Sequence, residues 1–235
     1  MARIARVVAP GCWHHITQRG NHRQIVFFED ADRVMYLQLL RQHCGRHAVQ
    51  VVGYCLMNNH VHLLAVPHSA SGLAKGLGRA HTDYSRWLNM KRGETGHVWQ
   101  NRFYSCPLDE RHQWEALRYV ELNPVCAGLV RDAVDWHWSS AAAHTTGVDR
   151  TGILDLTDWS QRWNNETWRD ALDQGIEDAD LLERIRAATR TGRPAAGDDF
   201  VRQLEAGTSR MLRPQKRGPK ARAAARDSQL ELGVS

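Results

Sequence analysis

Two histidines, His60 and His62, stand one residue apart inside the apolar run Leu56–Leu64. In a β-strand, residues two positions apart point to the same face of the sheet, so the two imidazoles would lie side by side. Neutral imidazole is the commonest metal ligand among protein side chains. The pair therefore indicates a site for a divalent metal ion, although a strand with two polar side chains on its surface would show the same spacing.

A second pair of reactive residues lies further along the chain. The pattern of Gln113–Asn123 predicts a helix that ends at Pro124, because proline cannot continue the helical hydrogen bonds. Tyr119 and Asn123 are four residues apart and would share one face of this helix. A tyrosine hydroxyl can attack phosphorus, and an amide oxygen can bind a hard metal ion. Tyr119 could instead be a core residue with a bonded hydroxyl, and Asn123 a helix cap.

Four ordered segments together resemble a known family. The run His60-Val61-His62 resembles the His-hydrophobic-His signature of HUH single-strand nucleases. The set is similar to the single-tyrosine transposases, and most similar to the branch called REP-associated tyrosine transposases. The resemblance covers about residues 10 to 145. The segments that carry it are Ile16–Asn21, Leu56–Leu64, Trp99–Phe103 and Arg118–Leu129.

This resemblance implies an enzyme that cleaves and rejoins single-stranded DNA at hairpin or palindromic repeats. His60, His62 and Asn123 would hold Mg²⁺ or Mn²⁺. Tyr119 would form a 5′-phosphotyrosine bond and release a 3′-OH, with no nucleotide cofactor. Three alternatives stay open: a domesticated hairpin-binding protein that does not cut, a hydrolytic metal nuclease in which Tyr119 is structural, and a replication-initiator or relaxase relative within the HUH group.

DNA contacts are expected in two of the segments and just after the first of them. Single-stranded bases commonly stack on aromatic rings while arginines bind the phosphates. Trp99 could equally be a core residue. The candidates for DNA binding are Arg19, Asn21, Arg23, Trp99, Gln100, Asn101 and Arg102.

The end of the chain is strongly basic. Residues 210–226 hold seven basic residues and no acid, which predicts a disordered tail with affinity for phosphates. Lys216, Arg217 and Lys220 could lie along a DNA groove, or the tail could serve only solubility.

Composition fits a DNA-binding protein of the cell interior. The 235 residues carry a net charge of +5, which suits a polyanionic partner. The five cysteines form no Cys-x-x-Cys pair, so neither a zinc ribbon nor a disulfide framework is indicated. We see no secretory segment and no apolar run long enough to span a membrane, and we expect a cytoplasmic, nucleoid-associated protein. It could be a monomer or a homodimer that exchanges the tyrosine helix.

The elements that must position these residues predict an α+β fold. We expect an antiparallel sheet with helices on one face. The resemblance implies a ferredoxin-like HUH nuclease core in which the histidine strand is central. The predicted elements before the Tyr119 helix are strands at Cys12–Gln18 and Gln24–Phe28, a helix at Asp30–Gly45, strands at Val49–Cys55 and His60–Val66, a helix at Ser71–Asn89 and a strand at Phe103–Leu108.

The helix at Asp30–Gly45 should bury Val34, Leu37, Leu40 and Cys44 and expose Arg33. Composition divides the chain into a catalytic domain at 1–148, a mainly helical C-terminal appendage at 149–212 and the basic tail at 213–235. The appendage is indicated by regularly spaced tryptophans, and the sequence does not assign its role.

Overall fold

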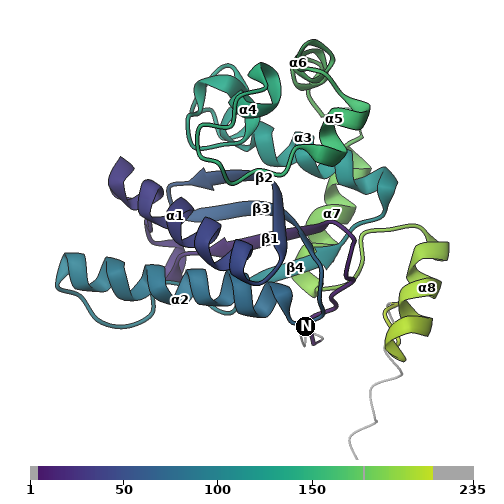
Figure 1. The fold of residues 1–235 in the computed structure, drawn as a ribbon, viewed down its shortest axis with the longest axis horizontal. Helices are drawn as coiled ribbons and strands as arrows, with labels where there is room; N and C mark the ends of the chain where they lie inside the picture. Colours follow the sequence, from purple (N-terminus) through teal and green to yellow (C-terminus); the bar gives the residue numbers. More distant parts are fainter. Residues whose placement is uncertain (1–4, 177, 214–235) are drawn as a thin grey trace, which may run out of the picture.

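The structure is a computed structural model that describes residues 5–176 and 178–213. Its central sheet has four antiparallel strands in the order β2-β3-β1-β4 (Figure 1). This is the split βαβ arrangement of ferredoxin-like folds, so the α+β class and the central position of the histidine strand are confirmed. The elements are β1 (His14–Arg19), α1 (Asp30–Arg46), β2 (Val49–Met57), β3 (His60–Pro67), α2 (Gly72–Arg92) and β4 (Tyr104–Pro107).

Both faces of the sheet are covered. Leu63 packs in a core with α1 and α2, whereas Leu64 on the opposite face packs in a core with α3 (Glu110–Cys126). His62 lies two residues before Leu64 and shares its face. The expectation of helices on one face holds for α1 and α2 only. Because β3 is apolar on both sides, a second helical layer must bury the face that carries His62.

A glycine lets α3 lie close to the sheet. The register of β2 shifts between Val51 and Gly53. A Cβ atom added at Gly53 would lie 2.4 Å from Cδ1 of Leu117, a fully buried residue of α3. Any larger residue at this position would force α3 outward, and Tyr119 lies on the same helix.

The predicted strand at Gln24–Phe28 does not form. Residues Asn21–Arg23 form a short 3₁₀ turn (η1), in which His22 and Arg23 have left-handed φ values of 51° and 61°. The backbone N–H groups of Val26 and Phe27 then donate to the carbonyl of Asn58. Both side chains turn into the core instead of alternating between two faces, so the segment has no strand partner.

The prediction that Pro124 ends its helix is wrong. Helix α3 continues to Cys126. Proline removes only one N–H from the hydrogen-bond ladder, a loss that is small near a helix end. The N–H groups of Ala127 and Leu129 donate to the carbonyls of Asn123 and Pro124, at 3.0 and 2.9 Å, and close the last turn.

Helix α1 buries Leu37, Leu40 and Cys44, as predicted, but Val34 and Arg33 depart from the predicted pattern. Val34 is 44% exposed, whereas Arg33 is 6% exposed. The guanidinium of Arg33 donates to Oδ1 of Asn58 at 2.6 Å, in the turn between β2 and β3. This polar contact, together with the aromatic rings beside it, keeps Arg33 buried next to the predicted apolar stripe.

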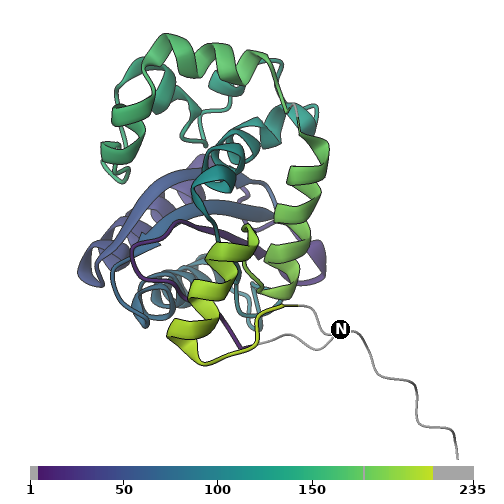
Figure 2. The ribbon, with the colours of Figure 1, turned by 90° about the vertical axis from the view of Figure 1, so that its right-hand side faces the viewer.

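The C-terminal region is helical, as predicted, and packs on the sheet. Trp168 and Ile185 lie in the same core as α3, and the figures show α7 beside α3 and β4 (Figures 1 and 2). The boundary at residue 148 stays a prediction, although residues on both sides of it share this core. The elements are η2 (Ala133–Asp135), α4 (Ala141–Thr146), α5 (Thr157–Arg162), α6 (Asn165–Asp173), α7 (Ala179–Thr191) and α8 (Asp198–Thr208).

A buried carboxylate joins α3 to these helices. Glu121 accepts hydrogen bonds from Ser140 Oγ and His144 Nδ1, both at 2.5 Å, and from Trp168 Nε1 at 2.8 Å. All four side chains are buried, so each contact replaces water that burial has removed. The network fixes α3 against α4 and α6, and the Ser140 hydroxyl also bonds to the backbone of Tyr54 in β2.

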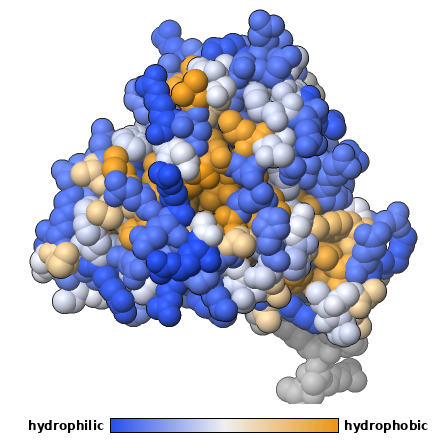
Figure 3. All heavy atoms as spheres, in the orientation of Figure 1, coloured by the Kyte–Doolittle hydropathy of each residue, from blue (hydrophilic) through white to orange (hydrophobic). Residues whose placement is uncertain are grey.

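The face of the molecule in Figure 3 is mostly hydrophilic, with apolar residues gathered around a hollow near its middle. Among the helices of residues 5–176 and 178–213, none is both long and apolar enough to cross a membrane. The predicted tail contacts Lys216, Arg217 and Lys220 lie outside the described residues.

Candidate active site

A cavity of about 390 Å³ opens over the histidine face of the sheet. Strands β1 and β3 form its floor, and α3, α7, the start of β4 and the loop before β4 supply its other side chains. It is lined by His15, Thr17, Gln18, Arg19, His60, His62, Gln100, Tyr104, Tyr119, Arg186, Thr189 and Arg190.

The structure brings His60, His62 and Tyr119 of one chain together, as the sequence predicts. The imidazole centroids of His60 and His62 are 5.1 Å apart, and the ring centroids of His62 and Tyr119 are 5.4 Å apart. The alternation of β3 places both histidines on the face that α3 covers. Tyr119 of α3 lies over the same face. No exchange of helices between subunits is needed to assemble these three groups.

Burial keeps the two imidazoles neutral. Desolvation, with a smaller contribution from the charge of Arg19, lowers the pKa of His60 to about 4. Desolvation also holds the pKa of His62 well below its usual range, and the neighbouring His15 and His60 act in the same direction. At neutral pH each ring therefore keeps a nitrogen lone pair, which a metal ligand requires.

The hydrogen bonds of His60 show which nitrogen is available. Its Nδ1 is 2.7 Å from Oδ1 of Asn59. The Asn59 amide nitrogen donates to the carbonyl of Arg23 at 3.0 Å, which directs the amide oxygen toward His60. The Nδ1 of His60 therefore carries the proton and Nε2 carries the lone pair. A ligating histidine characteristically donates its other N–H in this way.

The protein side chains of the cavity do not by themselves supply a complete set of metal ligands. Within the described ranges, no three His, Cys, Asp or Glu side chains are arranged to hold a metal ion. Two neutral imidazoles nevertheless fit an ion that keeps several waters and completes its coordination with substrate phosphates. The donor set of His60 and His62 is therefore compatible with a divalent ion.

Asn123, the predicted third ligand, is not brought into the cavity. It is half-buried and absent from the cavity lining. Its Nδ2 donates to the carbonyl of Tyr119 at 2.8 Å, one turn back along α3. The side chain thus lies along its own helix, and its role as a ligand stays a prediction.

Sequence reasoning missed seven residues of the cavity, namely His15, Thr17, Gln18, Tyr104, Arg186, Thr189 and Arg190. Arg186 donates from Nε to the hydroxyl of Tyr119 at 3.4 Å, and its guanidinium carbon lies 5.0 Å from the tyrosine ring centroid. The strand alternation of β1 would have placed His15 on the His62 face once the register was known. Nothing in the sequence connects Arg186 or Thr189 with the histidines.

The two predicted DNA-binding segments lie side by side. The backbone N–H of Gln100 donates to the carbonyl of Arg19 at 2.9 Å, and that of Asn21 to Val98 at 2.8 Å. Gln18 adds a side-chain bond to the carbonyl of Asn101 at 2.8 Å. These bonds fasten residues 98–101 along the end of β1, next to the cavity.

Most of the predicted DNA-binding side chains are accessible. Asn21 is half-buried, while Arg19, Arg23, Gln100, Asn101 and Arg102 are exposed.

Trp99 is the exception among these candidates. It is only 7% exposed, packs against Tyr36, His81 and Tyr84, and donates from Nε1 to the carbonyl of His81 at 3.1 Å. This position favours a core role over base stacking, because most of its ring surface is already covered.

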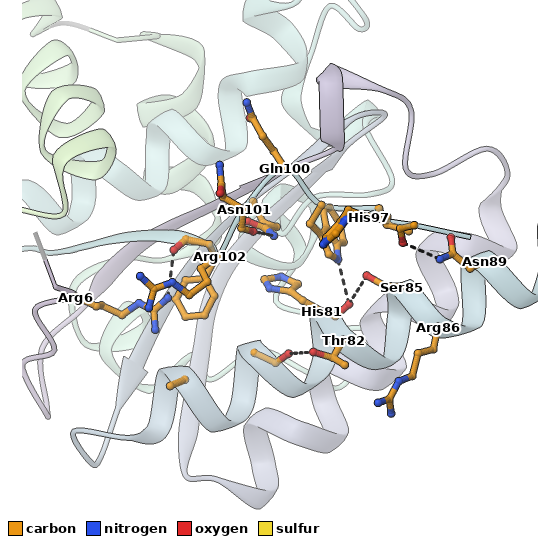
Figure 4. A pocket seen from close by; sticks show the side chains of 17 residues that line it. Arg6, His81, Thr82, Ser85, Arg86, Asn89, His97, Gln100, Asn101 and Arg102 are labelled. Atoms are coloured by element: carbon orange, nitrogen blue, oxygen red, sulfur yellow. Dashed lines mark hydrogen bonds between the residues drawn. The ribbon is translucent and has the colours of Figure 1, made fainter. Parts of the chain in front are cut away.

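A second cavity of about 770 Å³ adjoins the first and shares Gln18 and Gln100 with it. Figure 4 shows Thr82, Ser85 and Asn89 along α2 on one side and Gln100, Asn101 and Arg102 on the other. The two cavities thus meet at Gln18 and Gln100, between Tyr119 and α2.

Comparison with known proteins agrees with this arrangement. Residues 9–123 match the family model described as "Transposase IS200 like". This part of the chain is similar to the IS200-like transposase family. The match covers β1 to α3 and contains His60, His62, Tyr119 and Asn123.

A relative from Haemophilus influenzae, named as a candidate REP-associated tyrosine transposase, is 27% identical over 111 residues. The alignment covers 43% of this chain, and the chain spans 63% of the length of that relative. The resemblance to REP-associated tyrosine transposases inferred from the sequence is confirmed.

Two solved structures are also similar. One, titled as a REP-associated tyrosine transposase bound to a REP hairpin, aligns with a TM-score of 0.52 at 16% identity, over 64% of this chain and 90% of that chain. The other, a Deinococcus radiodurans protein titled as a candidate transposase, aligns with a TM-score of 0.35 at 19% identity, over 51% and 96%. The first of these likenesses shows a shared fold.

Buried neutral histidines should make the fold sensitive to acid. Burial lowers the pKa of His81 to about 3, whereas histidine in an unfolded chain titrates near ~6.5. Between these values the unfolded state binds more protons, so the free energy of unfolding falls as the pH falls. We expect His81→Gln to shrink the difference between the free energies of unfolding at pH 7 and pH 5 by about 2 kcal/mol. Urea unfolding followed by tryptophan fluorescence measures both values, and an unchanged difference would contradict the assignment.

Proposed function

We propose that this protein is a metal-dependent transesterase that cleaves and rejoins single-stranded DNA through Tyr119. The observation that carries the proposal is the meeting of Tyr119 with two neutral, paired histidines in one polar cavity. The solved relative is titled as bound to a REP hairpin, and we propose a DNA hairpin with a single-stranded flank as the substrate here. Such a substrate would associate the protein with the nucleoid.

His60 and His62 would hold the metal ion through their Nε2 atoms, with Asn123 as the predicted third protein ligand. When bound, Mg²⁺ or Mn²⁺ polarises the scissile phosphate as a Lewis acid.

The chemical step exchanges one phosphoester for another. The Tyr119 oxygen loses its proton to solvent or a base and bonds to phosphorus, while the bond from phosphorus to the 3′ oxygen breaks. That oxygen takes up a proton and leaves as a 3′-OH, and the 5′ phosphate stays on Tyr119. Rejoining is the reverse, with a 3′-OH as nucleophile and Tyr119 as leaving group. No bond energy is lost, so no nucleotide cofactor is consumed.

Arg186 is suited to assist both directions. Its guanidinium lies beside the Tyr119 oxygen, where negative charge develops as the proton leaves and again as the phosphotyrosine bond breaks. A fixed cation at that point stabilises the transition state more than the ground state. The long 3.4 Å distance agrees with contacts that tighten only when substrate is bound.

Replacing Tyr119 with Phe should abolish the covalent adduct and leave DNA binding in place, because only the hydroxyl is lost. The measurement is incubation with Mn²⁺ and labelled hairpin oligonucleotides taken from repeats flanking the gene, followed by a denaturing gel. Tyr104 lines the same cavity, so Tyr104→Phe is the matched control and should keep the adduct.

The pattern of products separates the alternatives. An adduct that survives in Tyr119→Phe but is lost in Tyr104→Phe would move the nucleophile to Tyr104. Cleavage without an adduct in the wild type would identify a hydrolytic nuclease. If the wild type binds a hairpin with measured affinity but forms neither an adduct nor a cleaved strand, the protein is a binding protein that does not cut.

Arg186→Gln should slow adduct formation on the order of 100-fold at saturating DNA, the usual cost of one charge-stabilising donor. Single-turnover rates with excess protein give the chemical step, and Arg186→Lys should recover part of it. Arg184 lies on the same helix but outside the cavity, so Arg184→Gln should react at the wild-type rate. Equal rates for Arg186→Gln and wild type would remove Arg186 from the mechanism.

The two adjoining cavities are suited to the single-stranded flank of the hairpin. A strand held at Tyr119 would pass Gln100 and reach the polar groups of α2. Arg19 lies at the catalytic end and Arg102 in the second cavity, where their charges can meet successive phosphates. Asn21, Arg23 and Asn101 lie along the same edge, and the basic residues Lys216, Arg217 and Lys220 would add contacts from outside the described part.

Arg102→Ala should weaken binding about equally for all flank sequences, because a phosphate contact carries no sequence information. The slope of log affinity against log salt should fall by about 0.7, the value for one phosphate contact on a single strand. Fluorescence anisotropy across a salt series measures the slope. Arg79 is exposed on α2 and lines neither cavity, so Arg79→Ala should keep the wild-type slope, and identical slopes for both variants would place the strand elsewhere.

A further inference from the structure

We infer that His15 and Thr189 are positioning residues, which hold His62 through a directed chain of hydrogen bonds in the tautomer whose Nε2 lone pair faces the cavity. The chain runs from β3 through β1 to α7, and its members are the side chains of His62, His15 and Thr189 and the carbonyl of Ile185. The inference rests on the proposed function for its purpose, since a lone pair on Nε2 is what a metal ion would bind.

The geometry between the two histidines is that of an in-plane hydrogen bond. His15 Nε2 and His62 Nδ1 are 3.1 Å apart. The ring planes differ by 13° and the centroids are 5.3 Å apart. Rings packed face to face would be separated by about 3.5–4 Å. Parallel rings at the larger separation, with two nitrogens in contact, meet edge to edge, as a shared proton requires.

The far end of the chain fixes the direction of every bond in it. The Thr189 hydroxyl lies 2.8 Å from the carbonyl of Ile185, which can only accept, so the hydroxyl proton points there. The hydroxyl oxygen must then accept from His15 Nδ1, which is 2.8 Å away. With its proton on Nδ1, a neutral His15 accepts at Nε2, and the proton between the rings belongs to His62 Nδ1.

The reversed arrangement leaves a contact without a proton. If His15 donated from Nε2 to His62, its Nδ1 would accept from the Thr189 hydroxyl. That proton would then be missing from the 2.8 Å contact between Thr189 and Ile185. Cys106 Sγ lies 3.2 Å from the Thr189 oxygen and can donate weakly to it in the favoured arrangement.

Burial makes the chain a permanent feature. His15 is 1% exposed and Thr189 is 3% exposed, so water cannot replace either partner. Asn59 holds His60 in the same Nδ1–H tautomer. The Nε2 atoms of His60 and His62 are therefore both left to bind a metal ion. Helix α7, which follows the family-matched segment in sequence, thus contributes to the alignment of a residue inside that segment.

The test starts from the tautomer itself, in full-length protein without metal or DNA. Long-range ¹H–¹⁵N correlation spectra of histidine-labelled protein at neutral pH should show His62 protonated at Nδ1. A signal from the Nε2–H tautomer in the wild type would overturn the inference, whatever the outcome of the cleavage assay.

Thr189→Val removes the end of the chain while keeping the shape of the side chain. We expect a larger population of the Nε2–H tautomer of His62. We also expect affinity for Mn²⁺ alone, measured by electron paramagnetic resonance, to fall about tenfold, a typical effect of removing a residue that hydrogen-bonds to a metal ligand. Thr189→Ser should restore both. Thr191 is on the same helix and donates to the carbonyls of Ala187 and Ala188 in α7, so Thr191→Val is the matched control.

The outcomes separate this inference from the proposed function. Unchanged tautomer and Mn²⁺ affinity in a Thr189→Val protein that melts like the Thr191→Val control would overturn the positioning role. If Thr189→Val unfolds, failure of Thr189→Ser to restore the wild-type tautomer would do the same. If the spectra and Mn²⁺ affinities are as expected but the wild type forms no covalent adduct, the transesterase proposal is refuted. The positioning role of the hydrogen-bond chain would still stand.

Discussion

The arrangement of the site depends on the burial of a central strand that is apolar on both faces. Leu63 and Leu64 of β3 lie in separate cores, so helices must cover the sheet twice. The outer layer of a ferredoxin-like sheet, α1 and α2, would by itself leave His62 in water. The helix that removes this face from solvent is α3, and it carries Tyr119. Tyr119 and the histidines therefore meet as a consequence of core formation.

The same burial sets the electrostatics of the cavity. Desolvation lowers the pKa of His60 and of His62, whose rings stay neutral beside Arg19 and Arg186. A neutral imidazole pair surrounded by arginines attracts phosphate without repelling a metal ion as strongly as charged histidines would. Arg19, Arg186 and Arg190 lie around the cavity, and in the proposed reaction their positive charge would attract the phosphate.

Local sequence patterns correctly predicted the strands, helices and shared faces that interactions between neighbouring residues determine. The alternation around His60 gave the strand and the shared face, and the helical spacing of Tyr119 and Asn123 gave α3. The errors arose where distant contacts decide instead. Val26 and Phe27 form no strand because Asn58 binds their N–H groups, and Arg33 is buried because the same turn residue accepts from it. Neither contact leaves a trace in the periodicity of the segment concerned.

The site shows the same division between local and distant determinants. A motif displays the groups that perform chemistry, so His60, His62 and Tyr119 could be recognised from type and spacing. It does not display the groups that orient them, because these need only lie within hydrogen-bond distance and can come from any element. Thr189 is separated from His15 by most of the chain, and as a threonine on a helix it looks like surface. Its buried contacts with His15 and Ile185 are what turn an ordinary helical residue into a part of the site, and only the folded structure brings them together.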